Sequence, residues 1–544
     1  MLEPAKETER GERSVETYDY VIVGAGSSGC VMAERLSRDP RVSVLLVEAG
    51  PPDHSMMIHI PRGVMEVANP GSRYLSLYEV QRGGIRGTEI WPKGRVLGGS
   101  SSVNGMIYAR GFAQDYDAWE AAGCEGWGWK DIGRCYKEME GHELGEGEWR
   151  GGAGPLKISV QHDVNPLMQS TIEAAGQLGV PLVRDINEAS EGGVALQTST
   201  THGGWRMSAA RAFIKPARGR KNLTIVTETE AKRLVFDGAR AVRVALRDRS
   251  GTREVTIGRE VILAAGALET PKLLQLSGVG PGKHLQALGI PVVADRENVG
   301  RNLREHVLVP LRYQVRGGTF ADEYRGLRLP INVLRQLLTG SGPLSYAAHE
   351  LVAFVKSRPE YDRADGEIGF INAGMRMKAN GKMGLQPGHS LTVISYYGRP
   401  SSQGHCLIQT ADPDRPMRID GNFLATEDDR RHSVDLVKFI DRIMKQPALA
   451  AATPVYAGPK SNTNFDSDDE VLDLVHLMAT GGRHVAGTCR MGSDPDSIVD
   501  TELRVRGVQG VRVIDTSIMP DLPTGNTNGP AMVMAWRAAE LIAN

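Results

Sequence analysis

The first fifty residues alternate short apolar runs with a glycine-rich turn and a helical pattern. Residues 20–23 are apolar and β-branched, residues 24–29 are rich in glycine and serine, and apolar residues then recur with helical spacing up to Leu36. A second apolar run, residues 42–47, ends at Glu48. This order of strand, turn, helix and strand predicts the opening unit of a doubly wound, parallel α/β sheet.

Similar patterns return much later in the chain. Residues 260–265 read as a strand, and Pro271 suits the first turn of a helix that ends near Ser277. Close to the C-terminus, residues 511–514 predict another strand and residues 531–543 a closing helix. We therefore expect one sheet to be assembled from segments that are far apart in the sequence.

The intervening segments are less clearly patterned, and residues 141–154, rich in Gly and Glu, predict a surface loop. Residues 1–17 are polar, lack the apolar centre of a signal peptide, and are expected to form a flexible lead-in. The expected organisation is a discontinuous cofactor domain (18–160, 215–310 and 481–544) and a substrate domain (161–214 and 311–480).

Composition excludes several classes of function. Of the 544 residues, 64 are basic and 65 acidic, so overall charge favours neither nucleic acid nor an anionic membrane as a partner. The five cysteines show no paired spacing, which argues against a disulfide framework or a zinc site and favours a reducing, cytoplasmic location. No apolar run is long enough to predict a transmembrane segment, and we expect no metal site.

The turn at residues 24–29 carries the pattern Gly24-x-Gly26-x-x-Gly29. The first glycine permits a tight turn, the second lets a pyrophosphate approach the backbone, and the third allows close helix packing. Glu48, at the end of the second strand, is placed to accept hydrogen bonds from an adenosine ribose. The motif predicts a dinucleotide site but does not separate FAD from NAD, so an NAD-dependent dehydrogenase remains an alternative.

Three longer stretches resemble the signatures of the glucose-methanol-choline (GMC) oxidoreductases, close to the choline and hydroxymethylfurfural oxidases. They are residues 94–104 (GRVLGGSSSVN), residues 266–280 (GALETPKLLQLSGVG), and a C-terminal set comprising 484–492, 515–520 and 525–529. Residues 299–306 add weaker support, with Glu305 where many members carry Asp. The resemblance implies an α/β fold with a Rossmann-like FAD-binding domain and a substrate domain built on a mostly antiparallel sheet plus helices.

The resemblance also implies which residues hold FAD. In some members a histidine directly before the asparagine equivalent to Asn104 is bonded to the flavin, and Val103 occupies that position here, so we expect non-covalent FAD. The expected cofactor-binding residues are Gly24, Gly26, Ser28, Gly29, Glu48, Arg95, Gly98, Gly99, Ser100, Asn104, Gly105, Ala231, Ala265, Gly266, Asp515 and Asn528.

Oxidising an alcohol by hydride transfer requires a base for the hydroxyl proton and a donor that stabilises the developing alkoxide. His484 matches the family's catalytic histidine, and the other twelve histidines are expected to be structural. Asn526 matches the second member of the pair and, because it cannot act as a base, is expected to hold the substrate oxygen. Asn528 lies two residues before Pro530 and is expected to cap the closing helix.

The predicted reaction is FAD-dependent oxidation of an alcohol, expected to be primary, to an aldehyde, with oxygen or another acceptor reoxidising the flavin. Glu350 resembles a glutamate of relatives that handle cationic alcohols, but we assign it to architecture and expect a neutral aromatic or aliphatic substrate. A flavin-containing lyase with redox-idle FAD is the alternative. The sequence determines neither the oligomeric state nor the natural alcohol.

Overall fold

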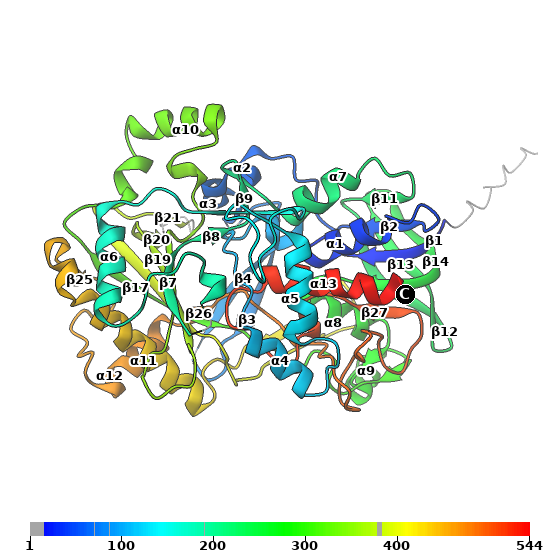
Figure 1. The fold of residues 1–544 in the computed structure, drawn as a ribbon. Coiled ribbons are helices and arrows are strands. Elements are labelled where there is room, and N and C mark those ends of the chain that lie inside the picture. The colour runs from blue at the N-terminus through cyan, green and yellow to red at the C-terminus, as the bar shows by residue number, and fades with distance from the viewer. Residues whose placement is uncertain (1–15, 70, 86, 190, 378–382, 544) are drawn as a thin grey trace, which may run out of the picture.

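The structure is a computed structural model that describes residues 16–69, 71–85, 87–189, 191–377 and 383–543. Most of the lead-in expected at residues 1–17 therefore lies outside the described residues. Two seven-stranded sheets dominate the architecture, one at each end of the molecule in the view of Figure 1.

The first sheet has the strand order β11-β2-β1-β14-β13-β12, with β27 paired to β14. The pairs among β11, β2, β1, β14 and β27 are parallel, whereas β12 and β13 are antiparallel additions at one edge. The strands are β1 (Thr17–Val23), β2 (Val44–Val47), β11 (Leu223–Val226), β12 (Glu230–Asp237), β13 (Arg240–Asp248), β14 (Gly251–Leu263) and β27 (Val511–Val513).

The sequence patterns predict this sheet well, because its parallel strands are buried on both faces and so read as continuous apolar runs. All four residues of β2 are buried, and α1 (Ser27–Leu36) follows the glycine turn as predicted. α1 packs against the closing helix, α13 (Asn528–Ala543). This contact brings the N-terminal and C-terminal parts of the chain together.

The helix predicted around Pro271 begins earlier than expected. α8 spans Gly266–Leu276, so Pro271 lies inside it rather than in its first turn. Proline lacks the N–H that would bond to the carbonyl four residues earlier, here Ala267. The Thr488 hydroxyl donates to that carbonyl at 2.6 Å, so a residue of the C-terminal segment replaces the missing bond.

The second sheet has the order β25-β17-β22-β19-β18-β7, with β26 paired to β17, and all of its pairs are antiparallel. Helix α11 (Glu427–Met444) packs on β22 and contacts α6 (Pro166–Gln177) and α12 (Asp468–Met478). The strands are β7 (Gly193–Leu196), β17 (Val307–Gln314), β18 (Leu351–Val355), β19 (Gly366–Ile371), β22 (Ser390–Tyr397), β25 (Val455–Tyr456) and β26 (Thr480–Gly481).

Smaller sheets connect segments assigned to different domains. β3 (Leu75–Gln81) and β4 (Thr88–Gly94) join β23 (His405–Leu407) and β24 (Arg418–Asp420), so the proposed domain limits run through a shared sheet. The remaining helices are α2 (Met56–His59), α3 (Val64–Val67), α4 (Ala113–Ala121), α5 (Trp129–Met139), α7 (Lys215–Ala217), α9 (Gly282–Ala287) and α10 (Arg328–Thr339). The other strands are β5 (Glu140–His142), β6 (Leu156–Val160), β8 (Thr198–Ser199), β9 (Thr201–His202), β10 (Trp205–Arg206), β15 (Val279–Gly280), β16 (Ala294–Asp295), β20 (Met375–Met377) and β21 (Met383–Leu385).

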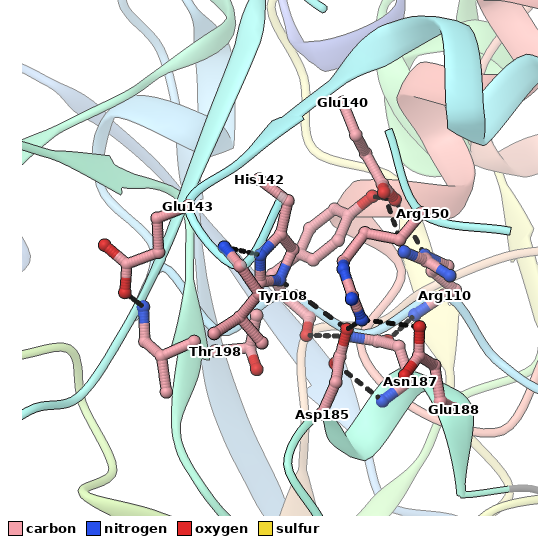
Figure 2. Close-up of polar contacts among 12 residues, drawn as sticks. Tyr108, Arg110, Glu140, His142, Glu143, Arg150, Asp185, Asn187, Glu188 and Thr198 are labelled. Atoms are coloured by element: carbon pink, nitrogen blue, oxygen red, sulfur yellow. Dashed lines mark hydrogen bonds and ion pairs between the residues drawn. The ribbon is translucent and has the colours of Figure 1, made fainter. Parts of the chain in front are cut away.

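The predicted surface loop at residues 141–154 is wrong at both ends. His142 is buried in β5, which pairs with β6, and Arg150 is buried against Asp185 with an N–O distance of 3.2 Å. Figure 2 shows the charged cluster that anchors this segment. Glycines and glutamates are typical of loops, but here Glu140, the residue just before the segment, is buried, and its ion pair with Arg110 offsets the cost of burying the charge.

None of the helices in the described part of the chain is both long and apolar enough to cross a membrane. The five cysteines are all buried and free. Across the same residues, no group of three or more His, Cys, Asp or Glu side chains is arranged to hold a metal ion.

Candidate active site

A cavity of about 780 Å³ runs from the first glycine turn to His484 and Asn526. Its walls come from the C-terminal edge of the parallel sheet, from the 94–107 segment and from the antiparallel sheet, through Leu308, Ile394 and Tyr396. All the predicted site residues line it except Gly29 and Gly98. The cavity therefore brings together residues separated by up to about 500 positions in the chain.

The glycine turn has the geometry that its sequence predicts. Gly24 has φ +99°, and a Cβ on Gly29 would lie 1.8 Å from the Gly24 carbonyl oxygen, so Gly29 serves close packing of α1 rather than the cavity wall. A Cβ on Gly26, in contrast, would meet no atom within 4 Å, and Gly26 lines the cavity. A ligand can therefore approach the backbone at Gly26, beside the N-terminus of α1.

Glu48 is buried at the end of β2. One carboxylate oxygen accepts from the Ala25 N–H at 3.0 Å and the other from the Gly50 N–H at 2.8 Å, which leaves acceptor capacity toward the cavity. Burial raises the pKa of Glu48 to about 7, against the lowering effect of these two bonds. The carboxyl group is thus oriented by the backbone before any ligand binds.

The 94–105 segment folds over the glycine turn. The Gly98 N–H donates to the Ala25 carbonyl at 2.8 Å, so Gly98 positions the loop and does not face the cavity. Asn104 also lines the cavity, but its Oδ1 accepts from Arg206 at 2.8 Å and from the Met106 N–H at 3.1 Å. The side chain of Asn104 is therefore used to shape the segment around Val103.

The N-termini of α1, α8 and α13 meet at the cavity. Asp515 accepts from the Gly266 N–H at 2.9 Å and from Thr270 Oγ1 at 2.6 Å, which holds the start of α8. Ser28 lines the cavity, yet its hydroxyl donates to the Ala531 carbonyl at 2.9 Å and so joins α1 to α13. A ligand at Ser28 would contact backbone rather than the hydroxyl.

Asn528 is not the helix cap that the sequence predicts. The Ala531 N–H donates to the Thr527 carbonyl at 3.0 Å, so Thr527 occupies the cap position and Asn528 is the first residue of α13. Asn528 Oδ1 accepts from Ser27 Oγ at 2.7 Å, which ties the beginning of α13 to that of α1. The pattern located the helix boundary to within one residue, the usual uncertainty of such boundaries.

His484 and Asn526 are in contact, as expected for a catalytic pair. Asn526 Nδ2 lies 2.9 Å from His484 Nε2, and His306 Nδ1 lies 2.9 Å from His484 Nδ1. His306 Nε2 is 3.0 Å from the Gly398 carbonyl oxygen, which can only accept a hydrogen bond. This series of contacts determines which ring nitrogen of each histidine carries the proton.

Burial lowers the pKa of His306 to about 4, so His306 is neutral at pH 7 and its one N–H, at Nε2, donates to Gly398. Its Nδ1 is then an acceptor, and His484 must donate to it from Nδ1. Neutral His484 therefore carries its lone pair on Nε2, which accepts from Asn526 Nδ2. Because His484 lines the cavity, a proton acceptor is available there.

The surroundings of His484 keep it neutral. Burial lowers its pKa well below 6.5, and a positive charge on the ring is further opposed by the neighbouring His306, Lys93 and Arg483. Glu305 accepts from the His484 backbone N–H at 2.7 Å, and burial raises the pKa of Glu305 to about 7. The preceding residue, Arg483, has φ +68°, and Lys93 Nζ donates to its carbonyl at 2.9 Å, which holds this unusual backbone in place.

His306 is one of the twelve histidines expected to be structural, and the structure places it against the proposed base. It contacts His484 from the start of the antiparallel sheet, 178 positions away in the chain. His349 and Tyr396 also line the cavity, and the Tyr396 ring centroid lies 5.7 Å from that of His484. The signal for His306 was present in the family-like stretch 299–306, whereas no local pattern marks Tyr396.

Comparison with known proteins agrees with this geometry. The N-terminal sequence profile of the GMC oxidoreductases matches residues 18–308, and the C-terminal profile matches residues 400–535. The chain belongs to the GMC oxidoreductase family. Pseudomonas putida alcohol dehydrogenase [acceptor] is 36% identical to this GMC oxidoreductase over 536 residues, covering 96% of this chain and 95% of that protein.

Human mitochondrial choline dehydrogenase is 37% identical over 545 residues, which cover 98% of this chain and 91% of that protein. Among solved structures, pyridoxine 4-oxidase from Mesorbium loti superposes with a TM-score of 0.86 at 30% identity, covering 96% of this chain and 98% of that one. Formate oxidase gives a TM-score of 0.88 at 27% identity, with 98% and 99% covered. The predicted family, the α/β fold and the enzyme class are confirmed.

This GMC oxidoreductase is an FAD-dependent enzyme of the alcohol oxidoreductases, so the alternative of an NAD-dependent dehydrogenase is wrong. The residues present fit the cofactor: the open backbone at Gly26 suits a pyrophosphate, and Glu48 at the end of β2 suits a ribose. A Cβ on Gly266, at the start of α8, would likewise meet no atom within 4 Å. Val103 on the cavity wall excludes a histidyl bond at that position, in keeping with non-covalent FAD.

Proposed function

We propose that this enzyme oxidises a neutral primary alcohol to an aldehyde, with His484 as the base and Asn526 as the donor to the substrate oxygen. The observation that carries the proposal is the contact series Gly398–His306–His484–Asn526, because it leaves a lone pair on Nε2 at the cavity wall. When bound, FAD supplies the hydride acceptor, flavin N5.

The protein's part in the reaction is to remove one proton and to stabilise one oxygen. The substrate hydroxyl donates to His484 Nε2, which takes its proton, while Asn526 Nδ2 donates to the oxygen as negative charge develops. The resulting imidazolium donates from Nδ1 to His306, whose neutral ring accepts. In the structure as described, Asn526 and His484 contact each other directly, and the alcohol oxygen would insert between them.

The charge around Glu350 supports a neutral substrate. Glu350 is ion-paired with Arg62 and its other oxygen accepts from the Asn372 N–H at 2.8 Å, and the carboxylate is only 1% exposed. A carboxylate already neutralised by an arginine has little attraction left for a substrate cation. This arrangement supports the structural role expected for Glu350 and argues against a cationic alcohol, although human choline dehydrogenase is a relative.

The rival function is a lyase that retains FAD without using its redox chemistry. Anaerobic mixing of the enzyme with a panel of primary alcohols separates the two, because only the oxidoreductase bleaches its flavin absorbance. We expect neutral aromatic or aliphatic alcohols to bleach the flavin and choline to do so with a much lower kcat/KM. Absence of bleaching with every alcohol, together with cleavage of a cyanohydrin, would establish the lyase instead.

Oxygen or another acceptor reoxidises the flavin in this proposal, and parallel assays of peroxide and dye reduction distinguish them. We also propose a cytoplasmic location, supported by the five free, buried cysteines.

A further inference from the structure

Helix α10 (Arg328–Thr339) turns its apolar side outward and its polar side inward. Leu327, Ile331, Leu334 and Leu338 recur at intervals of four, three and four residues and so lie along one face of the helix. Leu327 is 85% exposed, Ile331 64% and Leu338 74%. A helix on the surface of a soluble protein normally shows the opposite arrangement.

The side of α10 that faces the protein is held by amides. Asn332 and Gln336 are the buried residues of the helix, and they donate to the carbonyls of Glu323 at 2.8 Å and Gly204 at 2.9 Å. These bonds orient the helix, so the outward position of its leucines is part of the fold. Figure 1 shows α10 at the periphery, outside the body formed by the two large sheets.

This apolar face is the main concentration of its kind on the described surface. Of the fifteen large apolar side chains that are strongly exposed there, seven lie between residues 327 and 338. Four of these seven form the apolar face, and exposed apolar side chains gathered in this way mark a binding face, because leaving them in water is unfavourable.

The charges beside the apolar face indicate what covers it. Arg328 and Arg335 flank it, and the sequence of α10, RLPINVLRQLLT, contains no acidic residue. The Arg335 guanidinium donates to Ser341 Oγ at 3.1 Å and has no acidic partner among the described residues, and Arg328 pairs with Glu323 at 2.6 Å in an exposed ion pair of little strength. Leucines on one face with arginines beside them fit the boundary between lipid chains and phosphate headgroups.

We propose that α10 docks this enzyme on the surface of a phospholipid bilayer, with the helix in the plane of the interface. A symmetric contact with a second copy fits less well, because it would bring like-charged arginines together without acids on the helix to pair them. The near-zero net charge of the whole chain gives no hint of this, since the signal is local. The proposal does not rest on the proposed reaction.

Flotation of the holoenzyme with vesicles of phosphatidylcholine and phosphatidylglycerol (7:3) tests whether α10 binds a bilayer surface. Wild type should float with the vesicles, and Leu334→Glu/Leu338→Glu should bind at least about tenfold more weakly, because two apolar anchors are lost. The matched control is Val455→Glu/Leu477→Glu, which changes two apolar residues away from α10 that are also more than half exposed and should bind like wild type. All these positions are exposed, so thermal midpoints should agree.

Failure of wild type to float, or equal loss in the control variant, would overturn the proposal. A dimer that dissociates in Leu334→Glu/Leu338→Glu without any vesicle binding by wild type would show that the face pairs with a second copy. Arg328→Gln/Arg335→Gln should weaken binding severalfold to the anionic vesicles, and unchanged binding would remove the arginines from the proposed contact. Flavin reduction by a soluble alcohol should be unaffected in every variant.

Discussion

Two polar clusters in the interior of the protein have different relations to the cavity. One is the proposed catalytic cluster of His484, His306 and Asn526, and the other is the charged cluster around Arg110 and Glu140 (Figure 2). Both contain groups whose pKa is shifted by burial, lowered to about 4 for His306 and raised for Glu140. Shifted pKa values therefore do not distinguish a catalytic cluster from a structural one.

What differs is whether the polar atoms reach the cavity, because Arg110 Nη1 in the second cluster also has no hydrogen-bond partner among the described residues. Asn526 Oδ1 has no hydrogen-bond partner among the described residues, and both Asn526 and His484 line the cavity. Arg110 and Glu140 are completely buried, bonded to each other at 2.7 Å through both carboxylate oxygens, and lie outside the cavity walls. The first cluster is arranged for a substrate, and the second holds chain segments together.

The largest effect is expected from removing the base. His484→Ala should slow flavin reduction by about 10² to 10⁴-fold while FAD stays bound, because the proton of the alcohol then has no acceptor. Anaerobic stopped-flow absorbance measures this rate, and the retained flavin spectrum serves as the control for folding. A rate within a few-fold of wild type would assign the base to another residue.

Glu140→Gln tests the charged cluster, and its effect should be on stability. It removes the carboxylate bonded directly to the buried Arg110 guanidinium, leaving Asp185 as a nearby acid, and we expect this to cost about 3 to 5 kcal/mol of unfolding free energy. Glu297→Gln, which breaks the exposed pair with Arg301, should cost less than about 1 kcal/mol. Denaturant unfolding compares the two. If Glu140→Gln instead slowed flavin reduction in folded protein, the charged cluster would belong to the active site.

Asn526→Ala should raise the barrier to flavin reduction by about 2 to 4 kcal/mol, because the donor to the developing alkoxide is lost. The thermal midpoint should change little, since Asn526 has an unused carbonyl oxygen and bonds only to a side chain that the substrate also contacts. A large drop in the midpoint with an unchanged rate would mean that Asn526 is structural.

The pH dependence of flavin reduction should reflect the lowered pKa of His484. Only the neutral ring is a base, so the rate should be independent of pH above 6.5 and fall about tenfold per unit below the pKa of the folded protein. Rates measured with one alcohol from pH 5 to 9 test this. A rate that already declines between pH 8 and pH 7 would show that the protonated form of His484 is stabilised, contrary to its surroundings.

The smallest effect is expected at Asn528. Asn528→Ala removes the bond with Ser27 between two helix starts and should cost about 0.5 to 1.5 kcal/mol of stability, with a smaller effect on flavin reduction than Asn526→Ala. Ser27→Ala should cost a similar amount, and the double variant little more, because both remove the same bond. If Asn528→Ala abolished reduction while Asn526→Ala only lowered stability, the roles of the two asparagines would be reversed.

The sequence alone determined the parts of this protein that depend on local backbone requirements. The glycine turn before α1, the buried apolar strands and the histidine and asparagine proposed to be catalytic were all recognisable, since each occupies a continuous stretch with its own conformational or chemical signature. The family and its FAD cofactor followed from the order of those stretches.

Only the tertiary structure decided how distant side chains pair. His306 sets the tautomer of His484 across 178 positions, and Arg62 neutralises Glu350 across 288. An apolar face such as that of α10 is normally the buried face of a helix, but here Asn332 and Gln336 face the protein and the leucines face outward. Hydrophobic periodicity indicates that a helix has two faces, whereas the contacts available around it decide which face is buried.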